Sequence, residues 1–218
     1  MVAEAKDRSV QIVGRSSSHF TRVAQMFAIE LSVPFELVPI YELGAMDSSL
    51  FGGNPALKMP ALRRGESVLF GTENICRALA EMSSCGKRVV WPEELRHDVA
   101  RNAQEMVWHA KAAQVQLIVG TRLAKLPADN PYFVKGRKGF VGALEYLEQH
   151  LATVLSMLPS PRDLSLFEVT LFCLVEHLQF RGMVPIEPYS SLAGFAQAFG
   201  ARPSALRTPY RVDVPPAS

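Results

Sequence analysis

The chain has 218 residues, of which 48% are hydrophobic and 20% charged, values typical of a folded protein rather than a disordered one. Its 23 Lys and Arg nearly balance its 21 Asp and Glu, and no run of like charges is present, so we expect no nucleic-acid partner. Cys76, Cys85 and Cys173 show no C-x-x-C spacing, which argues against a disulfide framework and a zinc site. The first ten residues lack an apolar leader and no apolar run is long enough to span a bilayer. We therefore expect a cytoplasmic protein without a bound metal or a membrane partner.

The first 85 residues alternate between strand-like and helix-like patterns. Residues 9–13 (SVQIV) are a short apolar run ending at Gly14, and an apolar helical face follows at Phe20, Val23, Phe27 and Leu31. Residues 35–40 (FELVPI) predict a second strand, and residues 44–54 predict a loop or an irregular helix. Two short strands at 59–62 and 67–70 precede a helix with Thr72 as its N-cap. The predicted order is βαβ followed by ββα.

Beyond residues 83–92 the sequence shows only helical patterns. Gly86 and Pro92 interrupt the periodicity, so we place a domain boundary there. Apolar residues at helical spacing predict helices over 95–117 and 140–158, and residues 166–178 are apolar on every face, as in a helix buried at the centre of a domain. Ser165 and Glu168 form a capping box at its start, and a last helix spans 191–199. The sequence thus predicts an α/β domain over residues 1–84 and an all-helical domain over residues 90–218.

Several motifs resemble those of the cytosolic glutathione transferases. Residues 54–62 (NPALKMPAL) closely resemble the N-P-x-x-K-[VM]-P-x-L stretch of that family. Residues 34–38 (PFELV) resemble its second strand, and ARPS at 201–204 with TPYR at 208–211 resembles its C-terminal ending. The resemblance spans nearly the whole chain, from Val10 to Arg211. It implies a thioredoxin-like, glutathione-binding first domain, a helical second domain that borders the site of an electrophile, and a homodimer.

The turn between the first strand and the first helix carries the serines Ser16, Ser17 and Ser18. Exposed N–H groups and the helix dipole favour an anion, such as a thiolate, at this position. In serine-type glutathione transferases, a serine four residues before an arginine donates its hydroxyl to the glutathione sulfur. The resemblance therefore makes Ser18, which lies four residues before Arg22, the catalytic candidate, with Ser17 as the alternative and His19 beside them at the glutathione site.

A hydrogen bond from Ser18 to a charged acceptor would be worth about 1.5 to 3 kcal/mol. Because one pKa unit corresponds to about 1.36 kcal/mol, the thiol pKa would fall by about one to two units. The thiolate would then dominate near neutral pH, which is the condition for nucleophilic attack. The alternative interpretation is that Ser18 serves only as the N-cap of the helix.

Two further segments are implicated in glutathione binding by the resemblance. Met59-Pro60 is predicted to be a cis peptide, because an X-Pro bond prefers trans by only about 0.5 to 1 kcal/mol. In the family, the backbone of the residue before this proline pairs with the cysteinyl amide of glutathione, although a purely structural cis-proline is equally compatible with the sequence. Lys58 would meet the glycyl carboxylate, or else be an exposed loop lysine.

Residues 71–75 (GTENI) stand where the family has an acid or Gln followed by Ser, whose side chains bind the γ-glutamyl end of glutathione. Thr72 keeps the hydroxyl, but Gly71 has no side chain to meet the ammonium group. Glu73 comes two residues too late to replace it by simple register. Since a buried ammonium without a partner is unfavourable, this departure lowers the glutathione affinity that we expect.

The resulting hypothesis is a glutathione transferase-like enzyme that uses glutathione as co-substrate and conjugates it to an apolar electrophile. Met106 lies on the long helix that borders the second substrate's pocket in the family, and it is the candidate contact for that electrophile. Two alternatives stay open. One is a non-catalytic ligand-binding or partner-binding member of the fold, for which Gly71 is the main evidence, and the other is a glutathione-dependent isomerase, which the Arg-Ser-Ser-Ser string loosely resembles.

Overall fold

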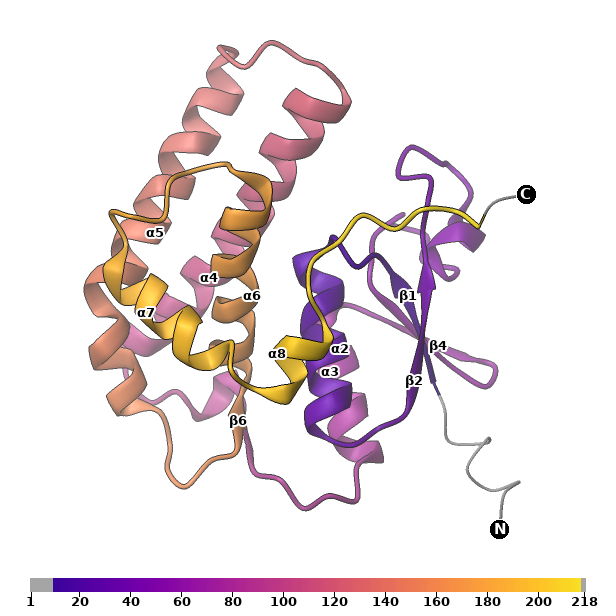
Figure 1. Cartoon of the computed structure of the whole chain (residues 1–218), viewed down its shortest axis with the longest axis horizontal. Helices are drawn as coiled ribbons and strands as arrows, with labels where there is room; N and C mark the ends of the chain where they lie inside the picture. Colours follow the sequence, from indigo (N-terminus) through magenta and orange to yellow (C-terminus); the bar gives the residue numbers. More distant parts are fainter. Residues whose placement is uncertain (1–9, 217–218) are drawn as a thin grey trace. The chain divides into compact units, whose positions relative to one another are not determined.

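The computed structural model describes residues 10–216. Ser9, the first residue of the predicted strand, and the segment on which the expected lack of a leader rests lie outside the described residues. The described chain divides into two compact units (Figure 1). One takes in the residues up to Val89 together with those from Phe199 onward, and the other is Val90–Ala198.

A four-stranded sheet with the order β2-β1-β3-β4 forms the base of the first unit. Its strands are β1 (Val10–Gly14), β2 (Phe35–Pro39), β3 (Ala61–Arg64) and β4 (Ser67–Phe70). β2 runs parallel to β1, whereas β3 and β4 are antiparallel to their neighbours. Val13 pairs with Ala61, and Ala61 pairs with Phe70. The end of β1, the start of β3 and the end of β4 therefore lie at the same end of the sheet.

Helices α2 (His19–Glu30) and α3 (Thr72–Met82) pack on each other and on one face of this sheet (Figure 1). α2 is buried over most of its length, because α8 (Pro203–Arg207) also contacts it. An apolar cluster of Val13, Ile40, Phe51 and Ala61 joins the sheet to the short 3₁₀ helix η1 (Ser48–Phe51), which Asp47 caps. The prediction of a loop or an irregular helix over 44–54 thus corresponds to η1 and its flanking turns.

The N-cap of α3 differs from the prediction. Gly71 is the N-cap, with φ +88° and ψ 131°, and Thr72 is the first helical residue. The assignment of Thr72 as N-cap is therefore wrong by one residue. A positive φ is accessible to glycine at little cost, so Gly71 lets the chain turn directly from β4 into α3.

The second unit is mainly helical. Its elements begin near the short strand β5 (Val89–Val90) and continue with η2 (Pro92–Glu94), α4 (Asp98–Leu117), the π-helical segment η3 (Ile118–Leu123), α5 (Pro131–Met157), β6 (Leu164–Ser165), α6 (Leu166–Arg181) and α7 (Ser190–Phe199). α5 starts well before residue 140, because the Asn130 side chain accepts a hydrogen bond from the Tyr132 amide at 3.0 Å and Pro131 suits a first helical turn. Ser165 caps α6, accepting from the Glu168 amide at 3.1 Å, and α6 is buried on nearly all sides. Over residues 10–216, none of the helices is long and apolar enough to cross a membrane.

Candidate functional site

Three segments named by the sequence analysis meet at one end of the four-stranded sheet. The serine turn follows Gly14 at the end of β1, Met59-Pro60 precedes Ala61 at the start of β3, and Gly71-Thr72 follows Phe70 at the end of β4. Neighbouring strands are about 4.8 Å apart, so β4, two strands from β1, lies about 10 Å from it. This end of the sheet is the candidate site, and the strand register brings its three segments together.

Ser18 is the N-cap of α2. It has an extended backbone (φ −98°, ψ 123°), and its Oγ accepts a hydrogen bond from the Thr21 amide at 3.2 Å. A hydroxyl oxygen accepts through its lone pairs and keeps its own proton for another acceptor. The capping role and the predicted donation to a thiolate are therefore chemically compatible, and they do not compete for the same part of the hydroxyl.

The neighbours of Ser18 are more deeply buried. Ser17 is 5% exposed and His19 is 1% exposed, with the His19 ring 4.6 Å from the ring of Phe20. Ser16 donates both its amide and its hydroxyl to the carboxylate of Asp213, at 2.7 and 2.6 Å. Ser18 is thus the least buried of the three serines, which makes it the most accessible to a ligand.

The sequence around this turn explains its shape. A β-carbon at Gly14 would lie 2.3 Å from Oγ1 of Thr21, so only glycine admits this close approach. Thr21 Oγ1 in turn accepts a hydrogen bond from the Arg15 amide at 3.3 Å, which fixes the first residue of the turn. Arg22 is 2% exposed and donates to Ala205 O and Thr208 Oγ1, both at 3.3 Å. The arginine of the motif therefore also ties α2 to the C-terminal segment.

The loop before β3 is organised by Asn54. Its side-chain oxygen accepts from the Ala56 amide at 3.0 Å, and its side-chain nitrogen donates to Lys58 O at 2.9 Å. The Met59-Pro60 peptide bond is cis. Met59 is half-buried and packs against the apolar cluster of the sheet, whereas Lys58 is exposed. Asn54 thereby fixes the backbone that leads to Met59-Pro60, a role that the motif contains but that the sequence analysis did not assign.

At the start of α3, Thr72 is 8% exposed and Gly71 is exposed. Glu73 does not stand in for the missing side chain of Gly71. Its Oε1 accepts from both Nε and Nη2 of Arg77, at 3.0 and 2.8 Å, on the next turn of the same helix. The structure therefore provides no acidic or amide side chain from residues 71 or 73 for an ammonium group.

Other residues of chemical interest are Met106 and the three cysteines. Met106 is half-buried on α4, in the second unit. Cys76 and Cys173 are buried and form no disulfide, and Cys85 is exposed, where a hydrogen bond from the Ser83 hydroxyl lowers the pKa of its thiol. Among residues 10–216, no group of three or more His, Cys, Asp or Glu side chains is arranged to hold a metal ion.

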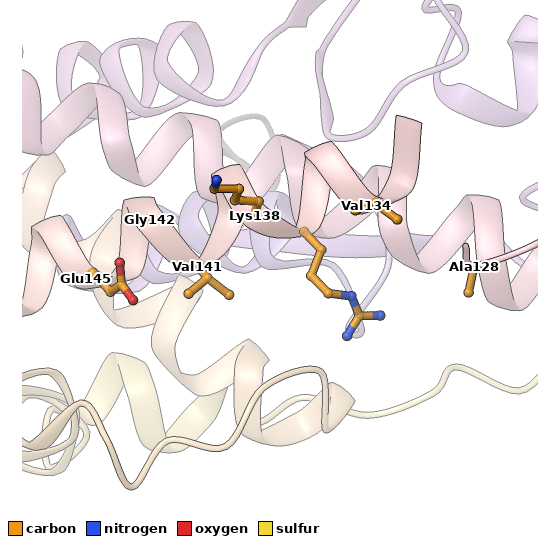
Figure 2. Close-up of a pocket in the computed structure, with 7 residues that line it drawn as sticks. Ala128, Val134, Lys138, Val141, Gly142 and Glu145 are labelled. Atoms are coloured by element: carbon orange, nitrogen blue, oxygen red, sulfur yellow. The ribbon is translucent and has the colours of Figure 1, made fainter. Parts of the chain in front are cut away.

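The second unit carries a groove of about 460 Å³ on α5 (Figure 2). Figure 2 shows the side chains of Lys138, Val141 and Glu145 on one stretch of this helix. The complete lining is Ala128, Val134, Arg137, Lys138, Val141, Gly142 and Glu145. None of these residues was named by the sequence analysis, and the groove is distinct from the candidate site on the sheet.

Residues 17–82 match the family model of the glutathione S-transferase N-terminal domain. The chain also has the fold of solved glutathione transferases. A family member from Pseudomonas fluorescens with bound glutathione has a TM-score of 0.75 at 20% identity, covering 93% of this chain and 100% of that one. A glutathione S-transferase from Methylobacterium radiotolerans in complex with glutathione sulfonate has a TM-score of 0.71 at 18% identity, covering 96% and 99%. A third, from Methylobacillus flagellatus with glutathione bound, has a TM-score of 0.71 at 16% identity, covering 92% and 98%.

No match is found among the curated proteins. Residues 17–82 thus match the glutathione S-transferase N-terminal domain, and the chain as a whole has the glutathione transferase fold, a thioredoxin-like part with a helical part. This confirms the fold class predicted from the sequence, and the match over residues 17–82 supports the family that the motifs resemble.

Proposed function

We propose that this protein is a glutathione transferase that joins the thiolate of glutathione to an apolar electrophile. The observation that carries the proposal is the meeting of the Ser18 turn, Met59-Pro60 and Thr72 at one end of the sheet. Solved structures of the same fold hold glutathione or glutathione sulfonate, which supports glutathione as the thiol.

In this proposal Ser18 is the catalytic residue, with Ser17 and His19 beside it. The Ser18 hydroxyl donates to the sulfur while its oxygen continues to cap α2. Both this hydrogen bond and the N-terminus of α2 favour the thiolate over the thiol. The thiolate sulfur then attacks the electrophilic carbon, a C–S bond forms, and the electron pair of the bond that breaks leaves with the electrophile's leaving group or adjacent atom.

The remaining residues bind the ends of glutathione. The backbone of Met59, held in place before Pro60, pairs with the cysteinyl amide. Thr72 and the first amides of α3 hold the γ-glutamyl carboxylate, as expected at a helix N-terminus. Lys58 meets the glycyl carboxylate, and Met106 contacts the apolar electrophile.

The experiment that tests the role of Ser18 separates its hydroxyl from its capping function. Ser18→Gly removes the hydroxyl but costs an N-cap only a few tenths of a kcal/mol, whereas Ser18→Thr keeps both functions. We expect Ser18→Gly to bind glutathione and to raise the pKa of the bound thiol by about one to two units, measured by thiolate absorbance against pH. Conjugation below that pKa should fall by about 10- to 100-fold, and Ser18→Thr should stay near the parent protein. A thiol pKa that is the same in all three proteins contradicts the assignment.

Binding itself is tested by the melting temperature with and without about 10 mM reduced glutathione. For a dissociation constant near 0.1 mM, mass action stabilises the fold by about 2.7 kcal/mol. For a chain of this size that corresponds to a rise of about 5 to 10 °C. An unchanged melting temperature contradicts glutathione binding at this affinity.

Gly71 favours a second candidate function, a non-catalytic binding protein of the same fold. Its missing side chain and the engagement of Glu73 with Arg77 leave the ammonium of glutathione without an acidic or amide partner from these two positions. Such a protein would bind an apolar ligand or a partner without conjugating it. Binding of glutathione with no conjugation of any apolar electrophile would favour this second candidate.

We further propose that the protein is a cytoplasmic homodimer. Cys76, Cys85 and Cys173 form no disulfide, which fits a reducing compartment, and the dimer follows from the family resemblance. Light scattering should give a mass of about twice 24.0 kDa. A monomeric mass at micromolar concentration contradicts the dimer.

A further inference from the structure

The C-terminal residues 208–216, here called the strap, return to the serine turn of the candidate site. Asp213 of the strap accepts hydrogen bonds from the Ser16 amide on Oδ2 at 2.7 Å and from the Ser16 hydroxyl on Oδ1 at 2.6 Å. Its side chain is only 6% exposed. The residues on either side of it, Val212 and Val214, are 60% and 77% exposed. The strap thus buries a carboxylate while it leaves neighbouring apolar side chains in solvent.

Beyond Asp213, the strap contacts Arg22 of α2. The ring of Tyr210 lies 4.3 Å from the Arg22 guanidinium, and Thr208 Oγ1 accepts from Arg22 Nε at 3.3 Å. Arg211 Nε is 3.9 Å from Asp213 Oδ1, and the Arg211 side chain is 70% exposed. Figure 1 shows this segment, in yellow, running from α8 past α2 toward the end of β1. Val212 and Val214 of the strap are exposed, and segments with little apolar burial open more readily than the core.

The position of the carboxylate matters for chemistry at Ser18. Ser16 and Ser18 are two positions apart in the sequence, so their backbones are separated by at most about 7 Å. A carboxylate bound at Ser16 therefore lies on the same turn as the position proposed for the glutathione sulfur. A like charge within about 4 to 6 Å disfavours a second anion and raises the pKa of a neighbouring thiol. The chain thus places its own anion at the turn where an external one would be activated.

We propose that the strap is an autoinhibitory latch on this site, closed by the contact between Asp213 and Ser16. This inference rests on the proposed function and adds its regulation. With the latch closed, the Asp213 carboxylate occupies the anion-accepting turn. When the strap is released, the Ser16 amide and hydroxyl and the N-terminus of α2 become available to the thiolate of glutathione.

The test compares the parent protein with Asp213→Ala and with a chain that ends after Arg211. The shortened chain keeps Tyr210, Thr208 and α8, so it removes the latch but not the packing of α8 on α2. The matched control is Glu66→Gln, which removes one exposed carboxylate from the turn at the opposite end of the sheet. Two quantities are measured in each protein: the hydrogen exchange rate of the Ser16 amide, and the dissociation constant of glutathione by calorimetry.

We expect the Ser16 amide to exchange at least about tenfold faster in both latch variants, and glutathione to bind at least about fivefold tighter, with Glu66→Gln matching the parent protein. Unchanged exchange at Ser16 overturns the latch itself. Faster exchange with unchanged or weaker binding overturns the autoinhibition and makes Asp213 a positioning residue. If none of the four proteins binds glutathione, the proposed function fails and its regulation fails with it. That result is distinguishable from failure of the latch alone, in which the parent protein binds glutathione and the variants bind it no better.

Discussion

At the scale of single residues, the backbone conformation of Gly71 explains why this position carries no acidic or Gln side chain. Its φ of +88° is a backbone conformation that L-residues rarely adopt, although a β-carbon there would meet only the Asn74 side chain, at ordinary distances of 3.6 and 4.0 Å. There is room for a side chain, but not the backbone conformation that suits one. The absence of an acid or Gln at this position is therefore coupled to the way in which α3 begins.

This coupling gives a prediction for stability. We expect Gly71→Gln to lower the free energy of unfolding by about 1 to 2 kcal/mol, because the left-handed region is unfavourable for L-residues. Gly139→Gln is the matched control, since Gly139 is exposed within α5 and a β-carbon there meets nothing within 4 Å. Replacing this mid-helix glycine should stabilise the control variant by about 0.5 to 1 kcal/mol. Urea denaturation measures the free energy of unfolding of both variants. If this free energy changes with the same sign in the two variants, the argument is refuted.

At the scale of elements, Glu30 joins three parts of the first unit. Located at the end of α2 and 6% exposed, it accepts from Arg202 at 2.9 and 3.0 Å, from the Ser204 hydroxyl at 2.6 Å and from Lys87 at 3.0 Å. Burial alone would raise the pKa of this carboxyl. The hydrogen bonds from Arg202, Ser204 and Lys87 outweigh burial and lower the pKa from 4.5 to about 2. The contact between α2 and α8 therefore requires an ionised Glu30.

A pH dependence of stability follows. Because the pKa of Glu30 is lower in the folded protein than in the unfolded one, its contribution is present above about pH 4.5 and is lost as the pH falls toward 2. The difference corresponds to about 3 kcal/mol. We expect Glu30→Gln to be less stable than the parent protein at pH 7 by that order and to approach it near pH 2, as measured by urea denaturation. Glu81→Gln, an exposed carboxyl on α3, should show no such convergence.

The elements also show what the sequence could and could not predict. Strands β1 to β4 and the cap of α6 depend on local signals, such as a short apolar run, a glycine, or a hydroxyl before a helix. The sequence therefore predicts their positions to within a few residues. α8 was missed because five residues are too short to show a helical period. The predicted N-cap of α3 is one residue too late, because Thr72 has a typical capping side chain whereas Gly71 makes the turn. Asp213 could not be found, since it meets Ser16 across 197 residues of sequence.

At the scale of the whole molecule, the first unit is discontinuous in sequence. The residues from Phe199 onward cluster with the unit that ends at Val89, although chain order alone suggested that they belong to the helical domain. Arg22 and Glu30 of α2, both nearly buried, bond to residues of this last segment. The end of the chain is thus part of the structure that carries the candidate site.

Removal of residues 199–218 should therefore destabilise the first unit. Buried charges that lose a partner typically cost about 3 to 5 kcal/mol. We expect amide exchange in β1 and α2 to accelerate sharply, while the fluorescence of Trp91 and Trp108, which both lie in the second unit, changes much less. The chain that ends after Arg211 is the control, because it keeps the Arg22 and Glu30 contacts. If the tryptophan fluorescence changes as strongly as the amide exchange of β1 and α2, the last segment does not stabilise the first unit selectively.

The return of the last segment to α2 also sets a time order during synthesis. The ribosome releases the residues of the sheet, which end at Phe70, before Arg202 and Ser204, the partners of Glu30. At about 5 to 20 residues per second, the stretch from Phe70 to Arg202 takes about 7 to 26 s to translate. During that interval the nascent chain carries α2 without α8. The first unit therefore reaches its final form only after the helical unit has been made.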